Sequence, residues 1–222
     1  MSFKAIIFDL DGTLLNTLND IVRSLNEVLK CHGFPIHSFD EYKYFVGNGA
    51  KTLIDRAVPK DTESFEKEKM LDEYLKYYGE HQCDDTCVYE GMRELLQDLN
   101  EADISISVLS NKPHNSTVQV IDHYYKGIKF DCVYGQRSGI PIKPDKTAAI
   151  MISESIHIPP SEIVFVGDSN VDIETAINSG MFPVGALWGF RTKDELLRYG
   201  AKKLVLHPKE ILDIFCDKEA TR

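Results

Sequence analysis

Short apolar runs alternate with amphipathic segments along most of the chain. Five runs are rich in Ile, Val and Phe: residues 3–9, 104–110, 130–135, 162–167 and 182–187. Several are apolar almost throughout, which is typical of strands buried on both faces of a parallel sheet. Between them, apolar residues recur at helical spacing. This alternation of strands and helices predicts a doubly wound, Rossmann-like α/β core with a parallel sheet.

Three helices of this core are predicted from apolar residues spaced three or four positions apart. The second ends before Gly180, a plausible C-cap, and the third begins at Pro208. Their apolar sets are Met92, Leu95, Leu96 and Leu99; Ile173, Ala176 and Ile177; and Ile211, Leu212 and Phe215. The polar tail, residues 217–222, is expected to fray.

Residues 16–88 break the alternation, because no convincing strand lies between the first strand and Met92. Thr17 and Asp20 resemble a capping box. Two helical faces follow, formed by Ile21, Val22, Leu25, Val28 and Leu29, and by Leu71, Tyr74, Leu75 and Tyr78. We therefore predict an α/β core made of residues 1–15 and 89–222, with an inserted all-helical domain at 16–88. The insertion would lie over the carboxyl edge of the sheet, where open α/β folds bind ligands.

The net charge and the cysteine content limit which partners and which cellular compartment are expected. The 222 residues include 25 Lys and Arg against 35 Asp and Glu, a net charge of -10, which disfavours nucleic acid and anionic membranes as partners. No apolar run approaches the roughly 20 residues of a membrane helix, and no secretory signal is apparent. Five scattered cysteines without a Cys-x-x-Cys pair indicate reduced thiols in the cytoplasm, and zinc at His81, Cys83 and Cys87 lacks a second ligand pair. We expect a cytoplasmic monomer or homodimer.

Four polar clusters lie at or after strand ends, at residues 9–13, 110–112, 143–145 and 167–172. The first holds Asp9 and Asp11, whose like charges would repel. Such a pair suits a hard cation, or a nucleophile with a proton donor beside it. Taken singly, each cluster has a simpler interpretation as a tight turn, a helix cap or a surface lysine. Their joint occurrence in this order favours one shared site at the carboxyl edge of the sheet.

The combination resembles the haloacid dehalogenase superfamily, in its phosphatase branch. Residues 9–13 match the family's first motif, Ser110 the second, Lys143 the third and residues 167–172 the fourth. The helical insertion resembles the family's mobile cap of the α-helical type. The dehalogenases themselves lack an acid at the position of Asp11. Displacing halide from carbon needs no protonation of the leaving group, whereas expelling an alkoxide does, so Asp11 indicates phosphoryl chemistry.

The resemblance implies a role for each motif residue. Asp9 would be the nucleophile that forms an aspartyl-phosphate, and Asp11 the general acid and base. Mg²⁺ would be held by the Asp9 carboxylate, the Asp11 carbonyl and the Asp168 carboxylate, with support from Asp172. Ser110, the Asn111 amide and Lys143 would hold the phosphoryl oxygens, and Lys143 would keep Asp9 ionised. Further substrate-binding residues in this first motif are expected to be Leu10, Gly12 and Thr13, because Gly12 lets the backbone turn its amides toward phosphate.

The helical insertion supplies a narrower resemblance. Residues 46–56, 110–113 and 187–190 are similar to segments of phosphoglycolate phosphatases, although 46–50 also suits a plain turn between helices. The predicted contacts to substrate in the insertion are Gly47, Asn48, Gly49 and Arg56, with Lys51 as a further candidate for a substrate carboxylate. We predict a Mg²⁺-dependent phosphatase acting on a small phosphate monoester such as 2-phosphoglycolate.

Several alternatives stay open. A β-phosphoglucomutase-like enzyme would carry a lysine and histidine pair in the cap, and no compelling pair is present. A phosphonatase would lack the acid at Asp11. A pyrophosphatase with the same cap type remains an alternative. A non-catalytic binding protein on the same fold is a remote one, because Asp9, Asp11, Lys143 and Asp168 are all retained.

Overall fold

Six parallel strands form the central sheet of the protein, in the order β5-β4-β1-β6-β7-β8. A computed structural model describes residues 3–216, so the tail predicted to fray at 217–222 lies outside the described residues. The strands are β1 (Ala5–Phe8), β4 (Ser105–Pro113), β5 (Cys132–Gln136), β6 (Ile163–Gly167), β7 (Phe182–Ala186) and β8 (Lys203–Val205). The chain builds outward from β1 to both sides, which creates a topological switch point at the centre of the sheet.

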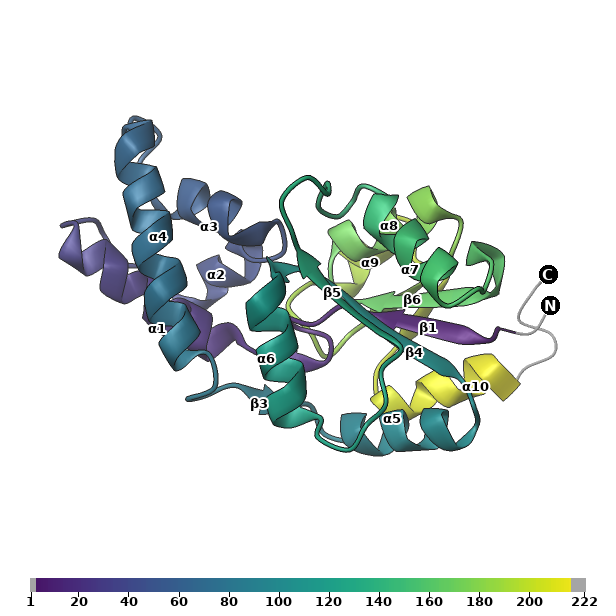
Figure 1. Cartoon of the computed structure of the whole chain (residues 1–222). Helices are drawn as coiled ribbons and strands as arrows, with labels where there is room; N and C mark the ends of the chain where they lie inside the picture. Colours follow the sequence, from purple (N-terminus) through teal and green to yellow (C-terminus); the bar gives the residue numbers. More distant parts are fainter. Residues whose placement is uncertain (1–2, 217–222) are drawn as a thin grey trace.

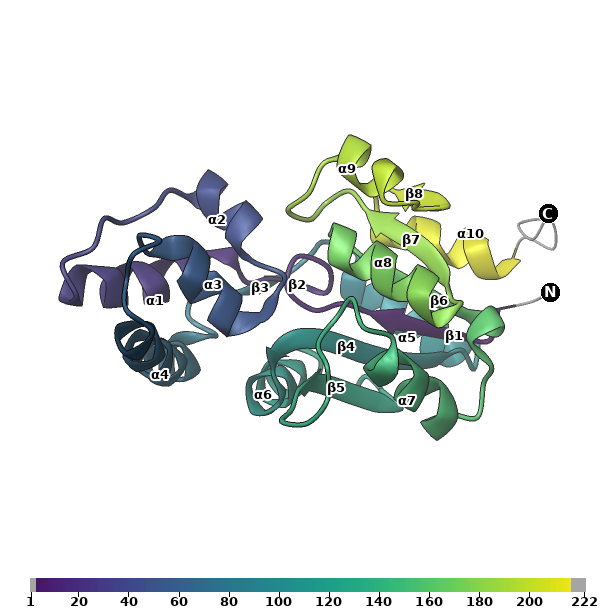
Figure 2. The ribbon, with the colours of Figure 1, turned by 90° about the horizontal axis from the view of Figure 1, so that it is seen from above.

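Helices cover both faces of this sheet (Figures 1 and 2). Successive side chains of β1 point to opposite faces. Ile6 and Phe8 pack in one core cluster with α5 (Met92–Glu101), α6 (His114–Tyr124) and α10 (Ile211–Cys216). Ala5 and Ile7 pack in another with α7 (Thr147–Ser155) and α8 (Asn170–Ser179). The side chains of β1 are apolar at every position because each face of the strand packs against a different core cluster. The predicted α/β fold class is confirmed.

The segment between β1 and α5 is helical and has a core of its own. It contains α1 (Leu18–Cys31), α2 (Phe39–Phe45), α3 (Gly49–Ala57) and α4 (Ser64–His81), whose apolar faces meet in a separate cluster. We call residues 16–88 the helical block. Figures 1 and 2 show it beyond the carboxyl ends of the sheet strands. The position over this edge agrees with the sequence pattern, and the domain boundaries at 15/16 and 88/89 stay a prediction.

Two short strands at the ends of the helical block were not expected. β2 (Leu15–Asn16) and β3 (Cys87–Val88) pair antiparallel and carry the chain into and out of the block. Two-residue strands have no periodic pattern to detect. The expectation that no strand lies between β1 and α5 is therefore wrong at both ends of the segment.

The predicted capping box at Thr17 is also wrong, because Thr17 makes no side-chain cap. Asp20 is instead fully buried and accepts hydrogen bonds from the Thr86 amide at 2.9 Å and from the Asp85 amide at 3.0 Å. Arg23 pairs with the same carboxylate at 2.7 Å. Asp20 thus ties the start of α1 to the turn just before β3, a contact over 60 residues in sequence that local spacing does not reveal.

Some elements of the core differ from expectation. β4 continues to Pro113 instead of ending at Ser110, with an irregular register against β5 between Leu109 and Pro113. The short strand β8 and helix α9 (Lys193–Arg198) carry too little apolar pattern to be predicted. Ile177, one of the apolar residues at helical spacing before Gly180, is 48% exposed.

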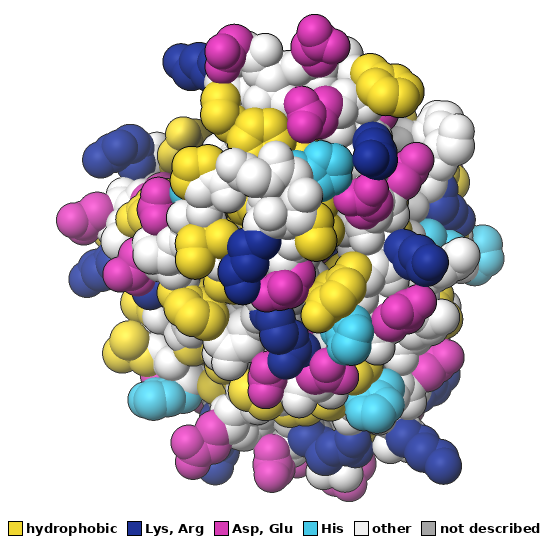
Figure 3. All heavy atoms as spheres, turned by 90° about the vertical axis from the view of Figure 1, so that its left-hand side faces the viewer, with side chains coloured by type: hydrophobic (Ala, Val, Ile, Leu, Met, Phe, Trp, Pro, Cys, Tyr) yellow, Lys and Arg dark blue, Asp and Glu magenta, His cyan; other side chains and the backbone are white. Residues whose placement is uncertain are grey.

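The outer face of the helical block carries charges of both signs. Figure 3 shows Lys and Arg side chains interspersed with Asp and Glu and with apolar side chains. This face therefore does not present the single-sign basic stripe typical of nucleic-acid binding. Among residues 3–216, no helix is both long and apolar enough to cross a membrane.

Candidate active site

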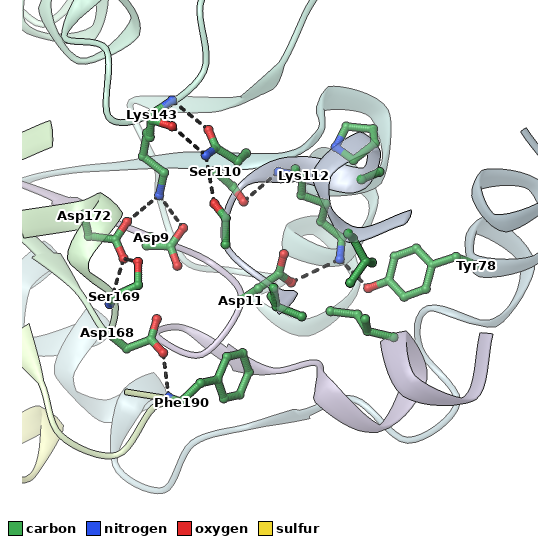
Figure 4. Close-up of a pocket in the computed structure, with 18 of the residues that line it drawn as sticks. Asp9, Asp11, Tyr78, Ser110, Lys112, Lys143, Asp168, Ser169, Asp172 and Phe190 are labelled. Atoms are coloured by element: carbon green, nitrogen blue, oxygen red, sulfur yellow. Dashed lines mark hydrogen bonds and ion pairs between the residues drawn. The ribbon is translucent and has the colours of Figure 1, made fainter. Parts of the chain in front are cut away.

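The centre of the site is a buried ion cluster between three strand ends. Asp9 follows β1, and Lys143 reaches it from the loop after β5 with Nζ 2.6 Å from Asp9 Oδ1. The same Nζ lies 2.6 Å from Oδ1 of Asp172, at the start of α8. Figure 4 shows the lysine between the two carboxylates. Burial alone would lower the pKa of Lys143, but the charges of Asp172 and Asp9 outweigh it and raise that pKa above its ordinary value.

Three buried carboxylates share this cluster. Asp9, Asp168 and Asp172 each offer an oxygen, and these oxygens lie within 4.8 Å of one another. Burial and repulsion from Asp172 raise the pKa of Asp9 well above its usual range, although Lys143 acts in the opposite direction. The same two causes raise the pKa of Asp168 to about 7. One lysine therefore does not neutralise the cluster, and the expectation that Lys143 keeps Asp9 ionised needs a further cation.

Close packing of glycine backbone fixes these carboxylates. Gly12 has a φ of +94°, and a Cβ added there would lie 2.5 Å from Oδ2 of Asp168. Asp168 also accepts a hydrogen bond from the Phe190 amide at 2.6 Å and from the Thr13 hydroxyl at 3.4 Å. Asp172 accepts from the Ser169 hydroxyl at 2.6 Å. A glycine at position 12 thus lets the backbone turn and also leaves room for the Asp168 carboxylate beside it.

Asp11 faces away from the three carboxylates. Its Oδ1 lies 3.1 Å from Nζ of Lys112, a lysine in β4, and the same ammonium donates to the hydroxyl of Tyr78 on α4 (Figure 4). Burial and the charge of Asp11 raise the pKa of Tyr78 well above its usual range, so the phenol stays protonated. Asp11 and Asp9 are thereby held in different surroundings although they are two residues apart.

A cavity of about 60 Å³ joins the strand ends to the helical block. Its lining includes Asp9, Asp11, Ser110, Asn111, Lys143, Asp168 and Asp172 from the predicted core motifs, and Gly47 and Gly49 from the block. Loop 46–49 is fastened to the core at two points: the Asn111 side chain donates to the Gly47 carbonyl at 2.9 Å, and Arg191 donates to the Val46 carbonyl at 2.9 Å. The structure thus brings together residues that are far apart in sequence.

Other predicted residues lie outside the lining. Leu10 is fully buried in the core, and its carbonyl accepts backbone hydrogen bonds from the turn that follows. Arg56 donates to the carbonyls of Tyr44 and Phe45 and to Oδ1 of Asn48. The guanidinium of Arg56 holds the shape of this turn. The structure therefore supplies no support for Arg56 or Asn48 as substrate contacts.

Several residues of the cavity were given no individual role from the sequence. Lys112, Tyr78, Phe190 and Arg191 all line it. A signal for Lys112 was present, because Ser110 and Lys112 are two residues apart and an extended strand turns both side chains to one face. Tyr78 was assigned only to the apolar face of a helix. Its hydroxyl gives it a second function that helical periodicity does not report.

Comparisons with known proteins agree with this arrangement. The sequence profile of a family described as Haloacid dehalogenase-like hydrolase matches residues 6–186. A phosphoglycolate phosphatase of Mannheimia succiniciproducens is 30% identical, covering 97% of this chain and 96% of that protein. An N-acetylmuramic acid 6-phosphate phosphatase of Pseudomonas aeruginosa is 28% identical, covering 96% and 95%.

A solved structure shows the same fold. A Lactobacillus delbrueckii subsp. bulgaricus protein, named provisionally as a phosphoglycolate phosphatase, superimposes with a TM-score of 0.92 at 27% identity and covers 97% of this chain and 99% of that one. The parallel sheet with Asp and Lys clustered at its carboxyl edge agrees with this class of hydrolase. The chain belongs to the haloacid dehalogenase-like hydrolases, and the resemblance noted in the sequence is confirmed.

The carboxylate cluster fits a magnesium ion. Mg²⁺ prefers a small number of carboxylate oxygens, with water and substrate oxygens completing its shell. Burial and repulsion from Asp172 raise the pKa values of Asp9 and Asp168, and a divalent cation bound between these carboxylates would counter both effects. The side chain of Asp11 points to Lys112. Asp11 would therefore contribute its backbone carbonyl, as the sequence motif implies.

This fit predicts that Mg²⁺ stabilises the protein more at high pH. The folded-state pKa of Asp168 is about 7, against an ordinary value of 3.8, so the metal-free folded state binds more protons in this window. The contribution of Asp168 to the stability of the metal-free folded state is therefore present below about pH 4 and is lost as the pH rises through about 7. We expect millimolar Mg²⁺ to raise the melting temperature by several degrees at about pH 8 and by much less at about pH 5.

The measurement is a thermal melt in chelator and in Mg²⁺ at both pH values. Asp168→Asn is the matched control, since it removes the titrating carboxylate with little change of shape. The variant should lose most of the pH-dependent difference. An equal Mg²⁺ shift at the two pH values in the wild-type protein would contradict this interpretation.

Proposed function

We propose that this hydrolase is a Mg²⁺-dependent phosphatase that cleaves a small phosphate monoester through an aspartyl-phosphate on Asp9. The observation that carries the proposal is the shared cavity: Asp9 and Lys143 lie at one end, Asp11 lies near the helical block, and Ser110 lines the same space. Family membership supports it, as do relatives named as phosphatases.

Each residue then has one chemical task. Asp9 attacks phosphorus, and the bond from phosphorus to the ester oxygen breaks. Asp11 gives a proton to the departing alkoxide and then takes one from the water that cleaves the aspartyl-phosphate. Ser110, the Asn111 amide and Lys143 bind phosphoryl oxygens as charge moves onto them.

Asp9, Asp168 and the Asp11 carbonyl would hold the Mg²⁺, with Asp172 in support. When bound, the ion offsets the repulsion between the Asp9 carboxylate and the incoming phosphate. Asp172 is fastened by Lys143 and Ser169, which keeps it beside the other two carboxylates. The cluster geometry and the family motifs support these assignments.

The preferred substrate is 2-phosphoglycolate. The cavity extends from the phosphate-binding residues at the strand ends to the helical block, so the block forms part of the space for the leaving group. A relative with matching length and 30% identity is named for this substrate. Closure of the helical block over the carboxyl edge would select the leaving group and exclude water. The cytoplasmic location and the monomer or homodimer stay predictions.

A steady-state substrate panel tests the choice. We expect kcat/KM for 2-phosphoglycolate to exceed that for glucose 1-phosphate, N-acetylmuramic acid 6-phosphate and pyrophosphate by at least about 10-fold, since missing or surplus contacts in a closed pocket cost that much. Activity should vanish in chelator and return with Mg²⁺. A higher kcat/KM for glucose 1-phosphate or pyrophosphate would contradict the choice of phosphoglycolate as the substrate. Interconversion of sugar phosphates without release of phosphate would identify a mutase.

A further inference from the structure

Lys112 is a buried lysine at the end of the cavity that faces the helical block. Its side chain is 3% exposed, and Nζ lies 3.1 Å from Oδ1 of Asp11. Nζ also donates to the Tyr78 hydroxyl and lies 4.4 Å from the centre of the Tyr78 ring. Figure 4 shows the Lys112 ammonium between the Asp11 carboxylate and the Tyr78 hydroxyl. A residue of the sheet therefore places a positive charge beside a residue of the block.

This ammonium has donor capacity that the described residues do not fill. A lysine has three N–H donors, and the side-chain hydrogen bonds of Lys112 go to Asp11 and Tyr78. The other two cations that line the cavity are held differently. Lys143 lies between Asp9 and Asp172, and Arg191 pairs with Glu195 at 3.3 Å while donating to a carbonyl of loop 46–49. Lys112 is the cation of this lining that Asp11 contacts.

The position of Asp11 sets the direction of the leaving group. If Asp11 protonates the ester oxygen, the rest of the alcohol must extend from that oxygen past Asp11, because Asp9 and the phosphoryl group fill the opposite side. Lys112 contacts Asp11 directly, Tyr78 of the block contacts Lys112, and both residues line the cavity beside Asp11. An anion placed there meets a positive charge in surroundings with little water, where electrostatic attraction is strong.

We propose that Lys112 determines specificity by binding a carboxylate on the leaving group. The substrate class is a small phosphate monoester whose alcohol part carries a carboxylate a few bonds from the ester oxygen. This inference rests on the proposed phosphatase function and names the residue that chooses among esters. Tyr78 holds the ammonium from the block, so the carboxylate site is complete only when α4 lies against the sheet.

Two matched pairs of esters test the proposal. Phosphoglycolate is compared with 2-hydroxyethyl phosphate, and 3-phosphoglycerate with glycerol 1-phosphate, because each pair differs chiefly in a carboxylate. For each enzyme we take the ratio of kcat/KM within a pair. Lys112→Met should lower this ratio by about 10- to 100-fold relative to wild type, the usual worth of a charge-assisted hydrogen bond. Lys112→Arg should retain most of the ratio.

Three further variants complete the design. Lys76→Met removes a charge from an exposed position on α4 and should leave the ratio unchanged. Arg191→Met removes the competing cation of the cavity and should change the ratio by less than about 3-fold, within the range of lost packing alone. Lys112→Gln keeps a polar but uncharged end on a side chain one atom shorter than lysine, and it should repeat the effect of Lys112→Met if the latter fails to fold.

The outcomes separate this inference from the proposed function. Equal losses on charged and neutral esters in Lys112→Met would show that Lys112 only positions Asp11, and would overturn the inference. A ratio that follows Arg191 instead of Lys112 would also overturn it. A wild-type preference for 3-phosphoglycerate with the Lys112 effect intact would overturn phosphoglycolate as substrate and keep the inference. No Mg²⁺-dependent hydrolysis of any ester by the wild-type protein would overturn both.

Discussion

Asp9→Asn should reduce kcat for every phosphate ester by at least about 10⁴-fold, as removal of a covalent nucleophile typically does. The amide occupies the same space beside Lys143 but has no anionic oxygen to attack phosphorus. The loss should be similar for aryl and alkyl esters, because both need the same nucleophile. The measurement is phosphate release from an aryl phosphate and from phosphoglycolate, with Mg²⁺ present.

The fold of this variant is expected to survive. Asp9 contributes one of the carboxylates in a cluster with excess negative charge, and its pKa is raised by burial and by Asp172. Lys143 keeps its ion pair with Asp172, and removing the Asp9 carboxylate relieves repulsion between like charges, so the metal-free melting temperature should stay level or rise. Lys76→Met, at an exposed position on α4, is the activity control. Retained turnover in Asp9→Asn would mean that another group attacks phosphorus, and the proposed mechanism would be wrong.

The sheet and the core motifs were predictable because local pattern and topology agree. A strand such as β1, apolar at successive positions, needs a core on both faces, and the two clusters around Ile6 and Ile7 provide them. Parallel strands bring their carboxyl ends to one edge, so Asp9, Lys143 and Asp168 meet despite their separation in sequence. Neither inference requires knowledge of any single contact.

The contacts between the helical block and the core were not predictable in this way. Asp20 was interpreted as a local cap and instead binds backbone amides at 85 and 86. Arg56, predicted as a substrate contact, donates hydrogen bonds to two carbonyls of a turn, a role that its position in the sequence did not indicate. A charged side chain has several partners of similar worth within reach, and three-dimensional packing decides among them. Sequence periodicity carries no information on that choice.

Asp11→Asn should have an effect that depends on the leaving group. For phosphoglycolate we expect kcat to fall by about 10²- to 10⁴-fold, the usual contribution of general acid and base catalysis. A 2,4-dinitrophenolate leaves without a proton, so the first step with 2,4-dinitrophenyl phosphate should remain fast. The second step still needs a base to activate water. The variant should therefore release a burst of about one dinitrophenolate per enzyme and then turn over slowly.

The burst also identifies the covalent intermediate. Enzyme quenched in acid after the burst should carry the mass of one phosphoryl group, located on the peptide that contains Asp9. Asp9→Asn/Asp11→Asn is the matched control and should show neither burst nor adduct. Lys112 contacts Asp11 and so offers a competing explanation, in which the substitution acts by freeing that ammonium. Lys112→Met distinguishes these two explanations. This variant retains the Asp11 carboxyl group, so it should give no burst. Equal losses of kcat for the dinitrophenyl and glycolate esters in Asp11→Asn, without a burst, would exclude Asp11 as the proton donor to the leaving group.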